Sequence, residues 1–134
     1  MHQLSNQANF KVLILLLFLL PSGSSAQLLQ PFTQGRVLDA RIEKITSART
    51  TDPLGALVAL DSIIAETLAS GDTLYTISAL MSKATIFGHQ ANYEAAYDNL
   101  WRGQLLAEET NSLRGRIIAY TEIGRYFSFY KRRE

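Results

Sequence analysis

The sequence of 134 residues contains no cysteine, which excludes disulfide bonds, zinc–thiolate sites and catalytic thiols. It also has no excess of charge of one sign, because 13 basic and 12 acidic side chains leave a formal net charge of +1. This balance gives no electrostatic reason to expect binding to nucleic acid or to an anionic membrane. A chain without cross-links must be held together by the packing of its core.

Motifs of catalysis are also missing. His89 is the only histidine after His2, and a single imidazole makes neither a catalytic triad nor a metal site, so we interpret it as a polar group at a helix end. Glu108 and Glu109 are adjacent, and neighbouring helical positions point about 100° apart, so their carboxylates do not converge. No phosphate loop, Gly-x-Ser-x-Gly or Ser-x-x-Lys context supports a reaction. We expect no catalysis, cofactor or metal; a small extracytoplasmic enzyme is a remote alternative.

Long apolar runs are limited to one segment, residues 12–20 (VLILLLFLL). Lys11 precedes it, no acidic residue accompanies it, and Pro21 and a series of small residues ending at Ala26 follow. This order predicts a secretory signal peptide over residues 1–26, cleaved near Ala26, and a periplasmic or extracellular mature chain. The alternative is a retained membrane anchor, but the run is much shorter than the roughly 20 residues of a spanning helix. We therefore expect membrane contact only through an uncleaved signal segment.

Because Lys11 is the only fully charged side chain among residues 1–26, the remaining chain has 12 basic and 12 acidic side chains. Residues 27–35 form a lead-in, and residues 36–130 repeat apolar side chains at the three- and four-residue steps of helices. Turn signals divide this part into helices beginning at Arg36 and spanning about 53–69, 73–89, 93–109 and 113–130. Short connections predict antiparallel neighbours, and the fold class is therefore all-α.

Individual residues mark the ends of these helices. Asp52 suits an N-cap, with Pro53 in the first turn, and Asp72 suits the next N-cap. Gly71 suits the left-handed position after a helix, and Asn92 suits the backbone of the turn at 90–92. Residues 131–134 form a basic tail, which we interpret as a solvated helix end; attraction to an anionic lipid or nucleic acid is the weaker alternative.

The sequence resembles itself at an offset of forty residues. Ala56 and Leu60 align with Ala96 and Leu100, and the segment around Ala84 aligns with that around Gly124. A fixed period of this size is typical of stacked helical repeats. We predict close helix contacts at the small residues Ala56, Ala84, Ala96 and Gly124. We expect the large side chains Phe87, Phe127 and Trp101 to pack between successive helix pairs. For Trp101 the alternative is a residue that stacks on a ligand.

The segment Leu80…Ala84…Phe87…Tyr93-Glu94-Ala95-Ala96…Leu100…Gly103 resembles the tetratricopeptide repeat in its order of large and small residues. Gly103 replaces the family's usual alanine, and Glu108 stands where the family has proline. The period is longer than the standard of about 34 residues, as in looser relatives from bacterial sensors and regulators. The resemblance implies a solenoid of antiparallel helix hairpins, about two and a half repeats over residues 36–130.

The resemblance also implies a concave groove that takes up a protein or peptide. By register within the matching copies, the residues facing it are Met81, Thr85, His89, Thr121, Arg125 and Phe129. The alternative is that they are ordinary surface residues. A binding scaffold without catalysis is the leading interpretation. The other interpretation is the N-terminal sensory fragment of a larger bacterial membrane signalling protein, a histidine kinase or a transcriptional regulator.

The helix predicted over 113–130 is rich in aromatic residues, among them Tyr120, Phe127 and Tyr130. No further predicted helix follows it to cover its apolar face. Since a large exposed apolar patch is typical of an interface, we expect self-association through this helix.

Overall fold

The computed structural model describes residues 38–130. Five helices, and no strand, account for these residues. The predicted signal peptide, lead-in and basic tail, at 1–26, 27–35 and 131–134, lie outside the described residues. The all-α class predicted from the periodicity is confirmed for the described part.

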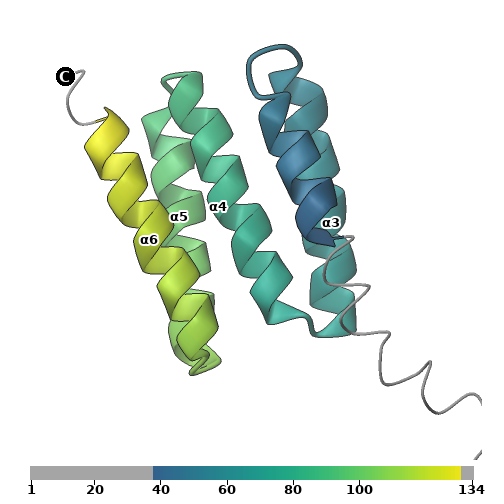
Figure 1. Cartoon of the computed structure of the whole chain (residues 1–134), viewed down its shortest axis with the longest axis vertical. Coiled ribbons are helices and arrows are strands. Elements are labelled where there is room, and N and C mark those ends of the chain that lie inside the picture. The colour runs from purple at the N-terminus through teal and green to yellow at the C-terminus, as the bar shows by residue number, and fades with distance from the viewer. Residues whose placement is uncertain (1–37, 131–134) are drawn as a thin grey trace, which may run out of the picture. The chain divides into compact units, whose positions relative to one another are not determined.

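The helices follow one another with short turns between them (Figure 1). The first occupies 38–47, and the others are α3 (Pro53–Ser70), α4 (Thr73–His89), α5 (Tyr93–Glu109) and α6 (Leu113–Tyr130). The bounds predicted for α3 to α6 are confirmed to within one residue. The helix at 38–47, α4 and α6 form one layer, with α3 and α5 behind it (Figure 1).

The ends of the helices are set by the residues that the sequence indicates. The side chain of Asp52 accepts a hydrogen bond from the amide of Gly55 at 3.0 Å, and Asp72 caps α4 in the same way. Gly71 takes the left-handed conformation, with φ of 74°. The interpretation of Asn92 needs a correction, because Ala91 holds the positive φ in that turn, at 56°, and Asn92 is the N-cap of α5.

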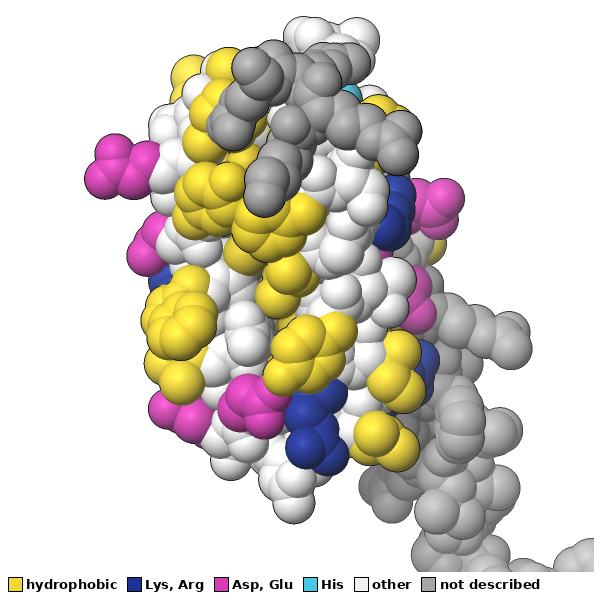
Figure 2. Space-filling view, turned by 90° about the vertical axis from the view of Figure 1, so that its left-hand side faces the viewer, with side chains coloured by type: hydrophobic (Ala, Val, Ile, Leu, Met, Phe, Trp, Pro, Cys, Tyr) yellow, Lys and Arg dark blue, Asp and Glu magenta, His cyan; other side chains and the backbone are white. Residues whose placement is uncertain are grey.

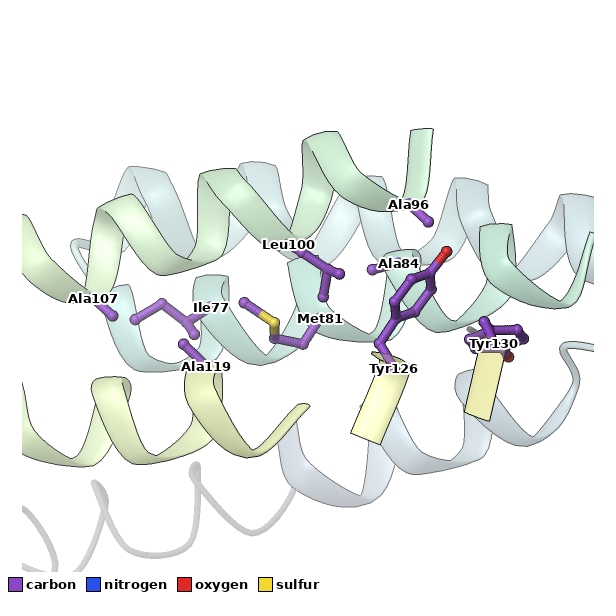
Figure 3. Close-up of a cluster of buried hydrophobic side chains, with 9 residues drawn as sticks. All are labelled: Ile77, Met81, Ala84, Ala96, Leu100, Ala107, Ala119, Tyr126 and Tyr130. Atoms are coloured by element: carbon purple, nitrogen blue, oxygen red, sulfur yellow. The ribbon is translucent and has the colours of Figure 1, made fainter. Parts of the chain in front are cut away.

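Helix α4 is the centre of the packing. It contacts α3, α5 and α6, and α5 also contacts α6. Two clusters of buried side chains meet on it, one toward α3 with Leu60 and Ile63, the other toward α5 and α6 (Figure 3). The second cluster consists of Ile77, Met81, Ala84, Ala96, Leu100, Ala107, Ala119, Tyr126 and Tyr130.

The close contacts at Ala56, Ala84 and Ala96 are confirmed, because all three are buried. The prediction for Gly124 is wrong: a Cβ built there would meet nothing within 4 Å, since no described helix covers that side of α6. The tight glycine on α5 is Gly103 instead, where an added Cβ would lie 2.3 Å from the Met81 methyl.

Two of the large side chains expected between helix pairs are exposed. Trp101 keeps 62% of its surface accessible, and Phe127 keeps 41%. The prediction for Trp101 is wrong, since this side chain lies on a face against which no described helix packs. The prediction for Phe127 is confirmed in part, because its ring lies 5.8 Å from that of Tyr97 on α5, in the preceding helix pair. Phe87 is half-buried and packs against the second cluster, as expected.

By length and composition alone, α3 is apolar enough to cross a membrane, although it has no uninterrupted apolar run like that at residues 12–20. Helices buried in a protein core meet the same criterion, but only 28% of α3 is buried in the structure. In the structure its polar side is paired with neighbouring helices. Asp61 lies 2.5 Å from the Lys83 ammonium, and Glu66 lies 2.9 Å from the Arg41 guanidinium.

Candidate partner-binding groove

A groove of about 590 Å³ lies between the helix at 38–47, α4 and α6. Each of the three helices contributes one stripe of side chains. The first wall carries Asp39, Ile42, Glu43, Thr46, Ser47 and Arg49; the floor carries Ser78, Met81, Ser82, Thr85 and His89; the second wall carries Ile118, Glu122, Arg125, Tyr126, Phe129 and Tyr130.

Five of the six residues that the register placed in a groove line this one. They are Met81, Thr85, His89, Arg125 and Phe129. Thr121 does not line it and is exposed elsewhere on α6. The α6 stripe runs through Ile118, Glu122, Arg125 and Phe129 at helical steps of four, three and four, and position 121 is about 100° away from 122.

The residues on the first wall were not predicted from the register, because the helix at 38–47 has a weaker repeat pattern than α4 and α6. The forty-residue offset was a usable signal. It relates Ser78, Ser82, Thr85 and His89 to Ile118, Glu122, Arg125 and Phe129, and all eight line the groove. Continued once more, it relates Ser82 to Ile42 and His89 to Arg49, which also line it.

The charges of the groove are separated along its length. Asp39 and Glu43 lie on the first described turns of the helix at 38–47, and Arg49 lies in the turn that follows this helix. Nε of Arg49 donates to Nε2 of His89 at 2.9 Å, which joins the ends of the first helix and α4. Arg125 lies 2.7 Å from Glu122 on the same helix.

Tyr75 borders the acidic end. Its hydroxyl donates to Oδ2 of Asp39 at 3.5 Å. Burial raises the pKa of Tyr75 above its ordinary value of 10.0, and the carboxylates of Asp39 and Asp72 raise it further. The tyrosine therefore stays protonated at neutral pH and holds the Asp39 carboxylate beside the groove.

The lining combines side chains that suit several kinds of contact. Ser82 and Thr85 bring hydroxyls to the floor, Ile118 brings a partly exposed apolar side chain, and Phe129 brings an aromatic ring. Met81 borders the floor from below, because it is 2% exposed and belongs to the core. Within residues 38–130, no group of three or more His, Asp or Glu side chains is arranged to hold a metal ion. Comparison of the chain with models of protein families, with curated proteins and with solved structures finds no match.

Proposed function

We propose that the chain is an exported scaffold of tetratricopeptide-like helix hairpins that binds a segment of a protein or peptide in the groove, without catalysis. The observation that carries this proposal is the repeated stripe. Residues forty apart on α4 and α6 face the same groove, so the two helices present side chains at matching heights along its length. Such an arrangement suits an extended chain lying along the groove.

The repeat architecture is supported by structural equivalences at the same offset. Asp52 and Asn92 are the N-caps of α3 and α5. The residues before α4 and α6 are also equivalent, because Gly71 and Asn111 both have a positive φ, of 74° and 49°. These pairs differ in residue type, so the equivalence reflects a repeated backbone and supports about two and a half repeats.

Export is proposed from the sequence of residues 1–26. N-terminal sequencing of the mature protein from the extracytoplasmic fraction should begin at Gln27, directly after the predicted cleavage position. A mature protein that retains residues 12–20 would contradict cleavage, and a protein found only in the cytoplasm would contradict export.

Binding in the groove is tested by selecting peptides from a random display library on the immobilised chain. The dissociation constant of a selected peptide is then measured by fluorescence anisotropy for two matched variants. Ser82→Trp places a large ring on the groove floor and should weaken binding by at least about tenfold. Ser62→Trp places the same ring on the exposed side of α3 and should leave binding unchanged.

Two results would contradict the proposal. One is a selected peptide whose affinity responds equally to Ser82→Trp and Ser62→Trp. The other is a library from which no peptide depends on the groove, measured with variants whose circular dichroism shows the helical content of the wild type.

A further inference from the structure

The outer side of α6 presents exposed apolar side chains, part of the apolar surface seen in Figure 2. Leu113 is 68% exposed, Ile117 is 59% exposed and Tyr120 is 51% exposed. Phe127 extends the row toward the end of the helix. On a helical wheel this row lies roughly 150° from the stripe that lines the groove, so the two surfaces are separate.

The spacing of the row is that of a coiled-coil seam. Leu113, Ile117, Tyr120, Gly124 and Phe127 follow one another at steps of four, three, four and three. This alternation keeps one narrow line of side chains along a helix and suits a second helix packed alongside it. A helix is therefore the shape of partner that this face fits.

We infer that α6 pairs with α6 of a second copy of the chain, antiparallel and about a two-fold axis. In an antiparallel pair, the two kinds of seam position face each other across the axis. One register of the α6 sequence places Ile117 opposite Phe127 of the second copy and Gly124 opposite Tyr120 of the second copy. By symmetry each of these contacts is made twice.

The glycine is the second observation that supports this register. A Cβ at Gly124 would meet nothing within 4 Å in its own chain, so the surface there has a gap between Tyr120 and Phe127. The ring of Tyr120 from the second copy would enter that gap. A parallel pair would instead place the two glycines opposite each other and leave a void, which favours the antiparallel arrangement.

The positions of the arginines on α6 favour the same antiparallel register. Arg114 and Arg116 flank the seam near the start of α6. In the antiparallel pair Arg114 faces Tyr130 and Arg116 faces Ser128 of the second copy, so the arginine pairs of the two copies lie at opposite ends of the contact. In a parallel pair the four guanidinium groups would gather at one end, and like charges in that position are unfavourable.

The area available is close to what a stable dimer needs. On α5, Tyr97, Trp101 and Leu105 are 44%, 62% and 45% exposed. They border the seam, because the ring of Tyr97 lies 5.8 Å from that of Phe127 and the Tyr120 hydroxyl donates to Glu108 of α5. With the four apolar side chains of α6, at roughly 100 Å² each, they present roughly 700 Å². A standard interface buries about 800 Å² on each partner.

The natural absence of cysteine makes cross-linking the sharpest test. Full-length chains carrying Ile117→Cys and Phe127→Cys are prepared separately, mixed and mildly oxidised. The antiparallel register predicts a disulfide-linked dimer in the mixture and little linkage in either variant alone. Val58→Cys, at a position 63% exposed on α3, is mixed with Phe127→Cys to measure linkage by random collision.

The proposal is overturned if the mixture links no better than the Val58→Cys control, or if either variant alone links as well as the mixture. Association through residues 12–20 would give linkage independent of position, and that result would also overturn it. Sedimentation equilibrium gives an independent measurement. Gly124→Leu fills the gap without touching its own chain and should raise the dissociation constant of the dimer at least tenfold.

Ser62→Leu, on the exposed side of α3, is the matched control and should leave the dissociation constant unchanged. A monomeric wild type, or a Gly124→Leu variant that dimerises as the wild type does, would contradict the pairing. Because this interface and the groove lie on different sides of α6, loss of the dimer need not affect peptide binding.

Discussion

Gly88 lies on α4 and Gly124 on α6, in the same layer of helices, but only Gly88 is closely surrounded by other side chains. A Cβ at Gly88 would lie 2.7 Å from the ring of Tyr126 and 2.9 Å from that of Tyr130. These rings pack against each other, with centroids 4.7 Å apart, so they have little room to move. We expect Gly88→Ala to destabilise the fold by about 1–3 kcal/mol, although alanine favours a helix. Urea unfolding of the monomer measures this.

Gly124→Ala is the matched control for that prediction. Its added methyl meets no atom of its own chain within 4 Å, so only the gain in helix propensity remains. We expect stabilisation by about 0.5–1 kcal/mol, measured at a concentration at which the chain is monomeric. If the two variants change stability by the same amount and in the same direction, the packing at Gly88 is not as described.

Tyr75 predicts a dependence of stability on alkaline pH. Its pKa is raised in the folded chain, by burial first and by Asp39 and Asp72 next. The unfolded chain therefore loses this proton more easily, and the contribution to stability is complete below pH 10.0 and falls as pH rises above it. Between pH 9 and 11 the melting temperature should fall less for Tyr75→Phe than for the wild type. For Asp39→Asn the fall in melting temperature should be intermediate. If the melting temperatures of all three proteins depend on pH in the same way, Tyr75 is not the group responsible.

At the scale of the helix, Ala96 marks the crossing of α4 and α5. It is fully buried and belongs to the cluster that contains Ala84 and Leu100. Ala96→Leu should separate the two helices and lower the free energy of unfolding by about 1–3 kcal/mol. Ala65→Leu makes the same change on the exposed side of α3 and should cost less than about 0.5 kcal/mol. Equal effects would mean that the crossing at Ala96 is not close-packed.

The helices were the part of the fold that sequence could predict, because their ends are local. A capping side chain and the amide that it bonds are three residues apart, as with Asp52 and Gly55. Whether another helix packs on a given side of a helix depends instead on contacts between distant parts of the sequence. Trp101 and Gly124 have the spacing of contact positions, but contact also requires another helix on that side. Within residues 38–130 none packs there, and no pattern inside α5 or α6 carries that information.

The lining of the groove also contains residues that the sequence predicts and residues that it does not. The matching stripes of α4 and α6 follow from the forty-residue offset, so Thr85 and Arg125 could be placed on one surface. On the first wall, Ile42 and Arg49 follow from the same offset, whereas the other lining residues depend on how the helix at 38–47 packs against α4. That packing includes long-range contacts, such as the hydrogen bond between Arg49 and His89, which are forty residues apart in sequence.

At the scale of the whole molecule, α4 should be the last helix to open. It contacts α3, α5 and α6, and both buried clusters include its side chains, with Ile86 in one and Ile77 in the other. Opening α4 therefore breaks both clusters, whereas opening α6 breaks only one. Native-state hydrogen exchange should show the slowest amides in Thr73–His89. Ile63→Val should speed exchange in α3 more than in α6, and Ala119→Gly should do the reverse. Exchange that is fastest in α4, or equal in all helices, would contradict a fold centred on this helix.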